Sequence, residues 1–314
     1  MTIELRPLRE SELREADGIY RRAFGTLRGL ADPLTFDGDA ERVRCRWAAD
    51  PDAAIALLED GVLAGTNFVS RWGSVGLFGP LAVDPPRQGR GLAHPLVEEA
   101  LRLLDRPQVA LRGLYTSVTD PRTVGLYQRH GYWPMSLAVL MQKTPVAGGE
   151  ATAGFEALSH LSPDAQAEAL SACRELADQV FDGLDVTGEI LSVGEQETGD
   201  TVLLREGSRL EGFAVCHAGK GSEAGSGRAA VRFGVVPSGE GGEERLRLLL
   251  EAVEAWAAAA GATVVTAGTG SGRVGAWQTL RAAGWLPFLQ GVAMHHARHP
   301  GYDIEDVFIL DDWR

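Results

Sequence analysis

One short stretch, Gln88–Ala93, most constrains what this chain can fold into, and it reads Gln-Gly-Arg-Gly-Leu-Ala. It follows an apolar, strand-like run that ends at Pro85 and Pro86, because a proline cannot donate a hydrogen bond to a sheet. Beyond it, apolar residues recur at helical spacing as far as Leu104, which predicts a helix with one buried face. A strand, a glycine turn and a helix N-terminus in this order present free backbone N–H groups to an anion such as a phosphate.

The same string is also compatible with a plain turn, since motifs this short have false matches. Two better-known phosphate motifs are excluded. No Gly-Lys-Ser or Gly-Lys-Thr follows the glycines, as a P-loop requires, and the spacing Gly-x-Gly-x-x-Gly of a dinucleotide fold is missing.

A second motif follows about forty residues later, where Leu126–Tyr132 reads Leu-Tyr-Gln-Arg-His-Gly-Tyr. Together the two strings resemble the signatures Gln/Arg-x-x-Gly-x-Gly/Ala and Leu-Tyr-x-x-x-Gly-Phe/Tyr of the GNAT acetyltransferases, the GCN5-related N-acetyltransferases. Order and spacing both agree. The resemblance covers residues 1–145 and implies a mixed sheet that is splayed open between its fourth and fifth strands.

The resemblance also implies which residues bind acetyl-CoA, the co-substrate of the family. One strand would supply backbone hydrogen bonds to the pantetheine arm and the thioester, and the glycine turn would hold the pyrophosphate, with Arg87 or Arg90 screening its charge. The residues to which the resemblance gives these cofactor-binding roles are Leu81, Ala82, Val83, Gln88, Gly89, Arg90, Gly91, Leu92, Ala93 and His94.

Tyr127 matches the tyrosine that protonates the departing thiolate in many relatives, although core packing alone also explains a tyrosine on such a helix. Asp120 falls where the family often has a coenzyme-contacting Asn, and a helix N-cap explains it equally well. The general base stays open, because the central strand from 75 to 83 has no carboxylate. Three alternatives stay open. The base is an acidic residue of the acceptor-side loop, or a water relays the proton, or no base is needed because the acceptor arrives neutral. The loop carboxylates are Asp37, Asp39 and Glu41.

The second half of the chain echoes the first. Pro85 and Gly131 are 46 positions apart, while Pro237 and Gly284 are 47 apart, and similar elements lie between them. We therefore predict two tandem GNAT-like α/β (α+β) domains, 1–145 and 154–314, with a small-residue linker at 146–153. The second copy is expected to bind no coenzyme, because it carries acidic residues where a pyrophosphate would bind and a leucine at the tyrosine position. These residues are Glu240, Glu243, Glu244 and Leu280.

Two stretches of the second half give further expectations. Residues 217–227 are rich in Gly and Ser, which predicts a mobile excursion. The acidic tail 301–314 is interleaved with apolar residues, so we expect it to dock on the body. The residues expected to be buried there are Tyr302, Ile304, Val307, Phe308, Ile309 and Trp313.

Composition narrows the partners. The net charge is −13, and all of it falls after residue 145, because 18 basic and 18 acidic residues balance before that point. An acidic second half disfavours nucleic acid, and no apolar run reaches the ~20 residues that cross a bilayer. Three scattered cysteines form no disulfide framework, so we expect a cytoplasmic protein. Adjacent His295 and His296 would point to opposite faces of a strand, so no metal site is expected.

Two functions follow from these observations. The first is an N-acetyltransferase that moves an acetyl group from acetyl-CoA to a primary amine of a small molecule, with the second domain shaping the cleft. The second is a non-catalytic acyl-CoA-binding or scaffold protein in which the missing carboxylate marks lost chemistry. O-acetylation of a hydroxyl fits less well, because it needs a stronger base. Amine-dependent release of CoA distinguishes the first two.

Overall fold

The computed structural model describes residues 2–146 and 155–314. The expected linker at 146–153 lies outside the described residues except for its first position. Apart from short 3-10 helices, the elements of the first half are β1 (Ile3–Pro7), α1 (Leu13–Leu27), α2 (Arg42–Ala49), β2 (Ala54–Glu59), β3 (Val62–Trp72), β4 (Val75–Phe78), β5 (Ala82–Val83), α3 (Ala93–Leu104), β6 (Leu111–Thr116), α4 (Pro121–Arg129) and β7 (Tyr132–Lys143).

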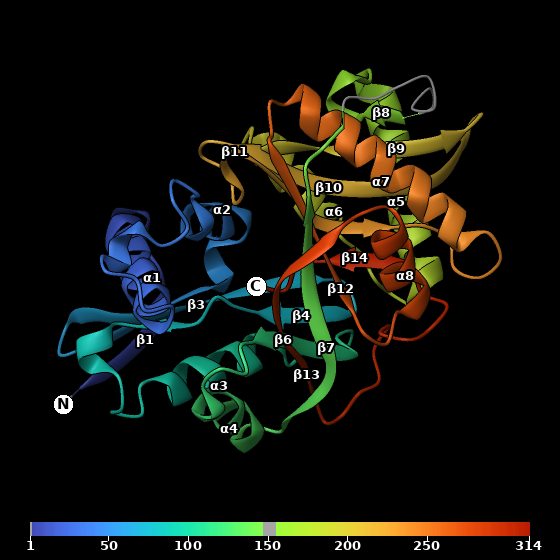
Figure 1. Cartoon of the computed structure of the whole chain (residues 1–314). Helices are drawn as coiled ribbons and strands as arrows, with labels where there is room; N and C mark the ends of the chain where they lie inside the picture. Colours follow the sequence, from blue (N-terminus) through green and yellow to red (C-terminus); the bar gives the residue numbers. More distant parts are fainter. Residues whose placement is uncertain (1, 147–154) are drawn as a thin grey trace.

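The second half repeats the same order of helices and hairpins and adds a short strand at its end. Its elements are β8 (Phe155–Ala157), α5 (Pro163–Val180), α6 (Thr187–Glu195), β9 (Gly199–Glu206), β10 (Arg209–Gly219), β11 (Gly225–Val235), α7 (Gly242–Ala259), β12 (Val264–Gly270), α8 (Val274–Ala282), β13 (Leu286–His296) and β14 (Ile309–Asp311). The fold is thus the predicted mixed α/β arrangement, a large and mostly antiparallel sheet with helices on both faces (Figure 1).

The alternation of side chains along each strand decides which helices cover which face. On β2, Ile55 and Leu57 pack with α3 and α4, whereas Ala56 and Leu58 pack with α1 and α2. Successive strand residues point to opposite faces, so a strand buried on both sides reads as a continuous apolar run. The strand β10 repeats this pattern, with Cys216 facing α7 and α8.

The two halves exchange strands, which the sequence did not predict. Along the sheet the order is β4-β6-β13-β7-β12-β11, so β13 lies beside β6 of the first half and β7 lies beside β12 of the second. The pairing of β13 with β7 is antiparallel and runs from Leu286 opposite Gln142 to His296 opposite Tyr132. One continuous sheet therefore joins the two halves.

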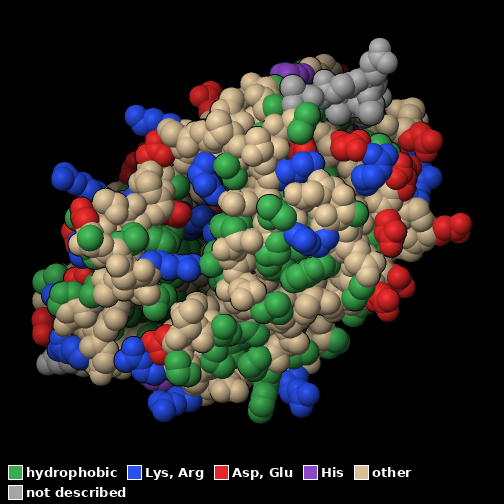
Figure 2. Space-filling view, viewed as in Figure 1, with side chains coloured by type: hydrophobic (Ala, Val, Ile, Leu, Met, Phe, Trp, Pro, Cys, Tyr) green, Lys and Arg blue, Asp and Glu red, His purple; other side chains and the backbone are tan. Residues whose placement is uncertain are grey.

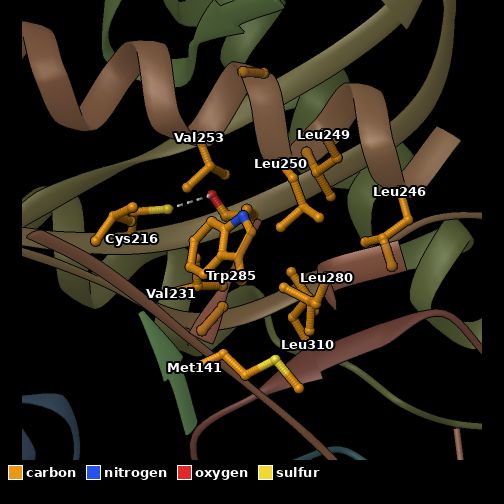
Figure 3. Close-up of a cluster of buried hydrophobic side chains, with 14 of the residues drawn as sticks. Met141, Cys216, Val231, Leu246, Leu249, Leu250, Val253, Leu280, Trp285 and Leu310 are labelled. Carbon is orange, nitrogen blue, oxygen red and sulfur yellow. Dashed lines mark hydrogen bonds between the residues drawn. The ribbon is translucent and has the colours of Figure 1, made fainter. Parts of the chain in front are cut away.

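Core packing follows this exchange. Figure 3 shows Trp285, which is fully buried, surrounded by leucines of α7 and by Leu280 of α8. Met141 on β7 belongs to the same cluster although it comes from the first half of the chain. A strand of one half thus completes the hydrophobic core of the other.

Two parallel strand pairs interrupt the otherwise antiparallel sheet, one in each half. The pairing of β4 with β6 stops at Leu77 opposite Gly113, and that of β11 with β12 stops at Ala230 opposite Thr266. Beyond Leu77 the chain turns away from β6, and β5 pairs with β3 through Val83 opposite Gly65. The expected opening between two central strands is therefore present in the first half.

The prediction for residues 217–227 is wrong. This stretch closes the hairpin of β10 and β11, and Ser222 and Glu223 are buried. The docked tail is confirmed, since Tyr302, Val307, Phe308 and Ile309 are buried, but Trp313 is half-buried and Ile304 is exposed. The segment ends at the centre of the molecule, between the two halves (Figure 1).

Candidate active site

The glycine turn leads directly into α3 and leaves the start of that helix open. Gly89 and Gly91 have φ values of +77° and +79°, a region that favours glycine, and open space lies where their side chains would be. The N-cap residue, Leu92, has no side chain that caps the helix, and the first turn carries no acidic residue. The positive end of the helix dipole is therefore open to an anion, while the N–H of His94 donates to Gly91 O at 3.1 Å.

Basic side chains of the turn are anchored to a buried carboxylate that the sequence did not reveal. Glu59, only 2% exposed, forms ion pairs with Arg87 and with Arg90, whose Nη2 lies 2.6 Å from Glu59 Oε1. Gln88 ties the turn to β5, because its Nε2 donates to the backbone oxygen of Val83 at 2.9 Å. Sequence analysis did not single out Glu59, because an acidic residue at the end of a strand, beside a hairpin turn, gives no signal of a functional role.

The residues of the two motifs meet in one apolar cluster. Val83 of β5 and Leu92 of the first motif pack in it with Tyr127 of the second, and Leu81 and Ala93 border it. Phe78, at the end of β4, lies against Tyr127 with ring centroids 5.8 Å apart. The structure thus brings the strand end, the glycine turn and the tyrosine together.

Tyr127 is 9% exposed, and burial raises its pKa to about 12. At neutral pH its hydroxyl is therefore protonated and able to donate a proton. His94, at the start of α3, places its Nδ1 2.9 Å from Nε2 of His130, which follows α4. Burial and the neighbouring His94 both lower the pKa of His130, which favours the neutral form of that ring.

The three acidic residues of the acceptor-side loop are each engaged. Asp37 accepts hydrogen bonds from Tyr20 (2.8 Å) and Arg42 (3.3 Å), Asp39 accepts from Ser226 N (2.8 Å), and Glu41 pairs with Arg44. Burial raises the pKa of Asp37, but Arg42 and Tyr20 outweigh it and leave the pKa below its usual value. Hydrogen bonds from Ser226 lower the pKa of Asp39. Both are thereby weakened as bases.

Asp120 caps α4, because its Oδ1 accepts a hydrogen bond from the backbone N–H of Arg122 at 2.9 Å. The capping interpretation of this residue therefore suffices to explain it.

In the second half the chain itself occupies the matching opening. The strand β14 pairs with β11 from Val235 opposite Ile309 to Phe233 opposite Asp311. These β11 residues stand where Leu81–Val83 stand in the first half, by the spacing of the two copies. The ring of Phe308 fills the space beside Gly242 and Gly275, at the starts of α7 and α8. A strand of protein thus fills this position in the second half.

The start of α7 is also acidic, as expected. A surface cleft there is lined by Glu240, Glu243 and Glu244, together with Lys143 and Arg247. Carboxylates at this point repel a pyrophosphate. Among the described residues, no group of three or more His, Cys, Asp or Glu side chains is placed to hold a metal ion.

The comparisons with known proteins agree with this geometry. Residues 20–132 match the family model described as the acetyltransferase (GNAT) family. They form a GNAT acetyltransferase domain. A search of curated protein sequences found no match.

Solved structures with the same fold extend over both halves. A putative acetyltransferase from Pyrococcus horikoshii is 13% identical with a TM-score of 0.70, and the match covers 99% of this chain and 95% of that one. A GCN5-related N-acetyltransferase from Sphaerobacter thermophilus is 18% identical with a TM-score of 0.62, covering 95% and 96%. A tandem GNAT protein from the clavulanic acid biosynthesis pathway is 14% identical with a TM-score of 0.54, covering 94% and 98%. At these identities the likeness shows a tandem GNAT fold.

A buried ion network holds the GNAT domain to the second half. Glu223 binds Arg42 at 2.9 Å and Arg46 at 2.9 Å, both on α2, and all three side chains are at most 7% exposed.

Figure 2 shows a hollow beside the lobe that carries α1 and α2, with basic side chains along it. No helix among the described residues is long and apolar enough to cross a membrane.

Proposed function

We propose that this protein transfers an acetyl group from acetyl-CoA to a primary amine of a small molecule, with its active site in the GNAT domain 1–145 and a second domain at 154–314. The observation that carries the proposal is the uncapped start of α3 beside an open strand end. The matching strand end of the second half is filled by β14. One coenzyme per chain is the consequence.

The cofactor-binding residues would act in two groups. The backbone of Leu81, Ala82 and Val83 would bond to the pantetheine arm, and the N–H groups from Gly89 to Ala93 would hold the pyrophosphate. Gln88 holds this turn against β5, and Arg90 and His94 border it. No metal is needed for this chemistry.

The reaction then follows from the groups present. The neutral amine nitrogen attacks the thioester carbonyl and forms a new C–N bond, with the charge on the carbonyl oxygen stabilised by a backbone N–H of the strand end. The C–S bond breaks, the thiolate takes a proton, and the nitrogen loses one. Tyr127 is the proposed acid, because its protonated hydroxyl lies in the cluster that borders the strand end.

We expect the substitution Tyr127→Phe to lower kcat by at least about 100-fold, the lower range for loss of an acid catalyst, with unchanged affinity for acetyl-CoA. The measurement is steady-state release of CoA together with calorimetric titration of acetyl-CoA. Tyr132→Phe is the matched control, since Tyr132 is also buried and also packs on Phe78, with centroids 5.5 Å apart. Equal kcat values for wild type and Tyr127→Phe would contradict the acid role.

The alternative, a non-catalytic acyl-CoA-binding or scaffold protein, predicts the same coenzyme titration but no amine-dependent turnover. Nucleic acid and membrane partners are not part of the proposal. A cytoplasmic location is proposed on the chemistry of Cys45, Cys173 and Cys216, which are unpaired and buried.

A further inference from the structure

A small cavity lies where the two halves share the sheet, outside the residues assigned above. Its floor is formed by neighbouring strands of both halves, β6 and β7 from the first and β12 and β13 from the second. The docked tail covers it through Tyr302 and Trp313. This cavity exists only because the halves exchange strands.

Five polar side-chain atoms that line the cavity are buried and have no hydrogen-bond partner among the described residues. Two of them belong to side chains that are 1% exposed, His295 and Thr269. Buried polar groups in folded proteins are almost always paired, with protein, water or a ligand. The five atoms are Tyr115 Oη, Ser136 Oγ, Thr269 Oγ1, His295 Nε2 and Asp303 Oδ2.

The hydrogen-bonding character of these atoms selects the ligand. The Nδ1 atom of His295 lies 2.7 Å from the backbone oxygen of His299, which can only accept, so Nδ1 carries the proton and Nε2 is an acceptor. Burial lowers the pKa of His295, which keeps the ring neutral. Asp303 Oδ2 also only accepts, and the three hydroxyl groups can accept. Two of the five atoms, His295 Nε2 and Asp303 Oδ2, therefore require N–H or O–H donors from a ligand.

The charges favour a cation. Asp303, Asp311 and Asp312 line the cavity together with Arg273. Arg273 already uses its donors within the protein, because it donates to Asp303 (3.1 Å), Asp311 (2.8 Å) and the backbone oxygen of Ile309 (2.7 Å). Arg314 pairs with Asp312. Among the side chains that line the cavity, three carboxylates face one guanidinium, which favours a positively charged group such as an ammonium.

The cavity lies one side chain away from the proposed reaction centre. The ring of Trp313, which lines it, covers Gly113 on β6, the residue paired with Leu77 at the end of the parallel ladder. The backbone oxygen of Trp313 is 3.8 Å from the point where a side chain on Gly79 would begin. Trp313 is therefore the side chain that separates the cavity from the strand end.

We propose that the cavity binds a second ammonium group of the acceptor, so that the acceptor is a small diamine whose other amine is acetylated. This inference rests on the proposed function. His295, Thr269 and Asp303 bind the distal ammonium through its three N–H donors, and Ser136 and Tyr115 line its path. The amine that reacts stays outside the cavity, at the end of β4.

The test is calorimetric titration of 1,4-diaminobutane, with butylamine as the matched monoamine, in the absence of coenzyme. We expect the diamine to bind at least tenfold more tightly than butylamine. Thr269→Val, which keeps the side-chain shape, and Asp303→Asn, which replaces the accepting oxygen with a donor, should each weaken the diamine at least fivefold. Thr201→Val is the matched control, because Thr201 is equally buried and unpartnered but lies on β9, away from the cavity.

Equal binding of diamine and monoamine, or no effect of either cavity variant, would overturn the inference and leave a cavity that holds only water. Failure of the proposed function gives a different result, because then no amine accelerates CoA release whatever the calorimetry shows. If monoamines and diamines are acetylated with the same KM, the transferase proposal stands and the diamine site falls.

Discussion

The substitution Gly91→Glu should abolish measurable binding of acetyl-CoA, with a loss of at least about 100-fold in affinity. Gly91 has a φ of +79°, and a side chain there enters open space beside the start of α3. A glutamate would place a negative charge where the phosphates are proposed to bind, opposing the helix dipole that attracts them. The measurement is calorimetric titration of acetyl-CoA into each purified protein.

Backbone strain is the competing explanation for such a loss, so the control must carry the same strain. Gly239→Glu serves, because Gly239 has a φ of +81°, is surrounded by open space and lies in the corresponding turn of the second half. We expect this variant to bind one acetyl-CoA per chain with the wild-type affinity. If Gly239→Glu lost binding while Gly91→Glu kept it, the coenzyme would bind in the second half of the chain, which would contradict our proposal.

The second large effect concerns stability. Glu223→Gln should lower the free energy of unfolding by about 3 kcal/mol, because removing one partner of a buried ion network leaves the other charges uncompensated. Here the charges left behind are those of Arg42 and Arg46, which are 5% and 7% exposed. Urea denaturation followed by tryptophan fluorescence measures the change. An unchanged midpoint would show that the network does not fasten α2 to the second half.

Glu244→Gln is the matched control, since Glu244 pairs with Arg247 on the exposed surface of α7 and its substitution should leave the midpoint unchanged.

The network of Glu223, Arg42 and Arg46 also makes the stability depend on pH. Burial raises the pKa of Glu223, but Arg46 and Arg42 outweigh it, so in the folded protein the pKa is below the ordinary 4.5. Its stabilising contribution is therefore complete above pH 4.5 and is lost as the pH falls toward the lowered value. Glu223→Gln should show a correspondingly smaller acid sensitivity.

Local patterns in the sequence predicted the parts of the fold that depend on neighbours along the chain. The glycine turn, the amphipathic helix after it and the apolar hairpins lie where expected, because period and turn chemistry act over a few residues. The apolar positions of the tail predicted its docking for the same reason. Ile304 is exposed, because a single apolar residue in a turn does not define a buried face of the segment.

Long-range pairing was beyond such patterns. The exchange of β7 and β13 involves strands about 150 residues apart, and each strand reads equally well as the partner of its own half. Residues 217–227 were predicted to be mobile because they are rich in Gly and Ser. In the structure a single glutamate, Glu223, anchors the loop through two arginines of α2. Glu59 was missed likewise, because its partners Arg87 and Arg90 lie far along the chain.

The cavity at the junction was invisible for the same reason, because its polar atoms come from four strands and the tail. His295 did attract notice, but only as one of two adjacent histidines, with His296, that were not expected to share a metal ion. In the structure its Nδ1 is held by His299, and its other nitrogen faces the cavity.

The measurement that tests the central claim most directly is amine-dependent release of free CoA from acetyl-CoA, followed with a thiol reagent for wild type, Gly91→Glu and Gly239→Glu. The account predicts release by wild type and by Gly239→Glu when a primary amine is present, and none by Gly91→Glu. If wild type binds acetyl-CoA but no amine accelerates release, the protein is a coenzyme-binding scaffold and the transferase account is contradicted.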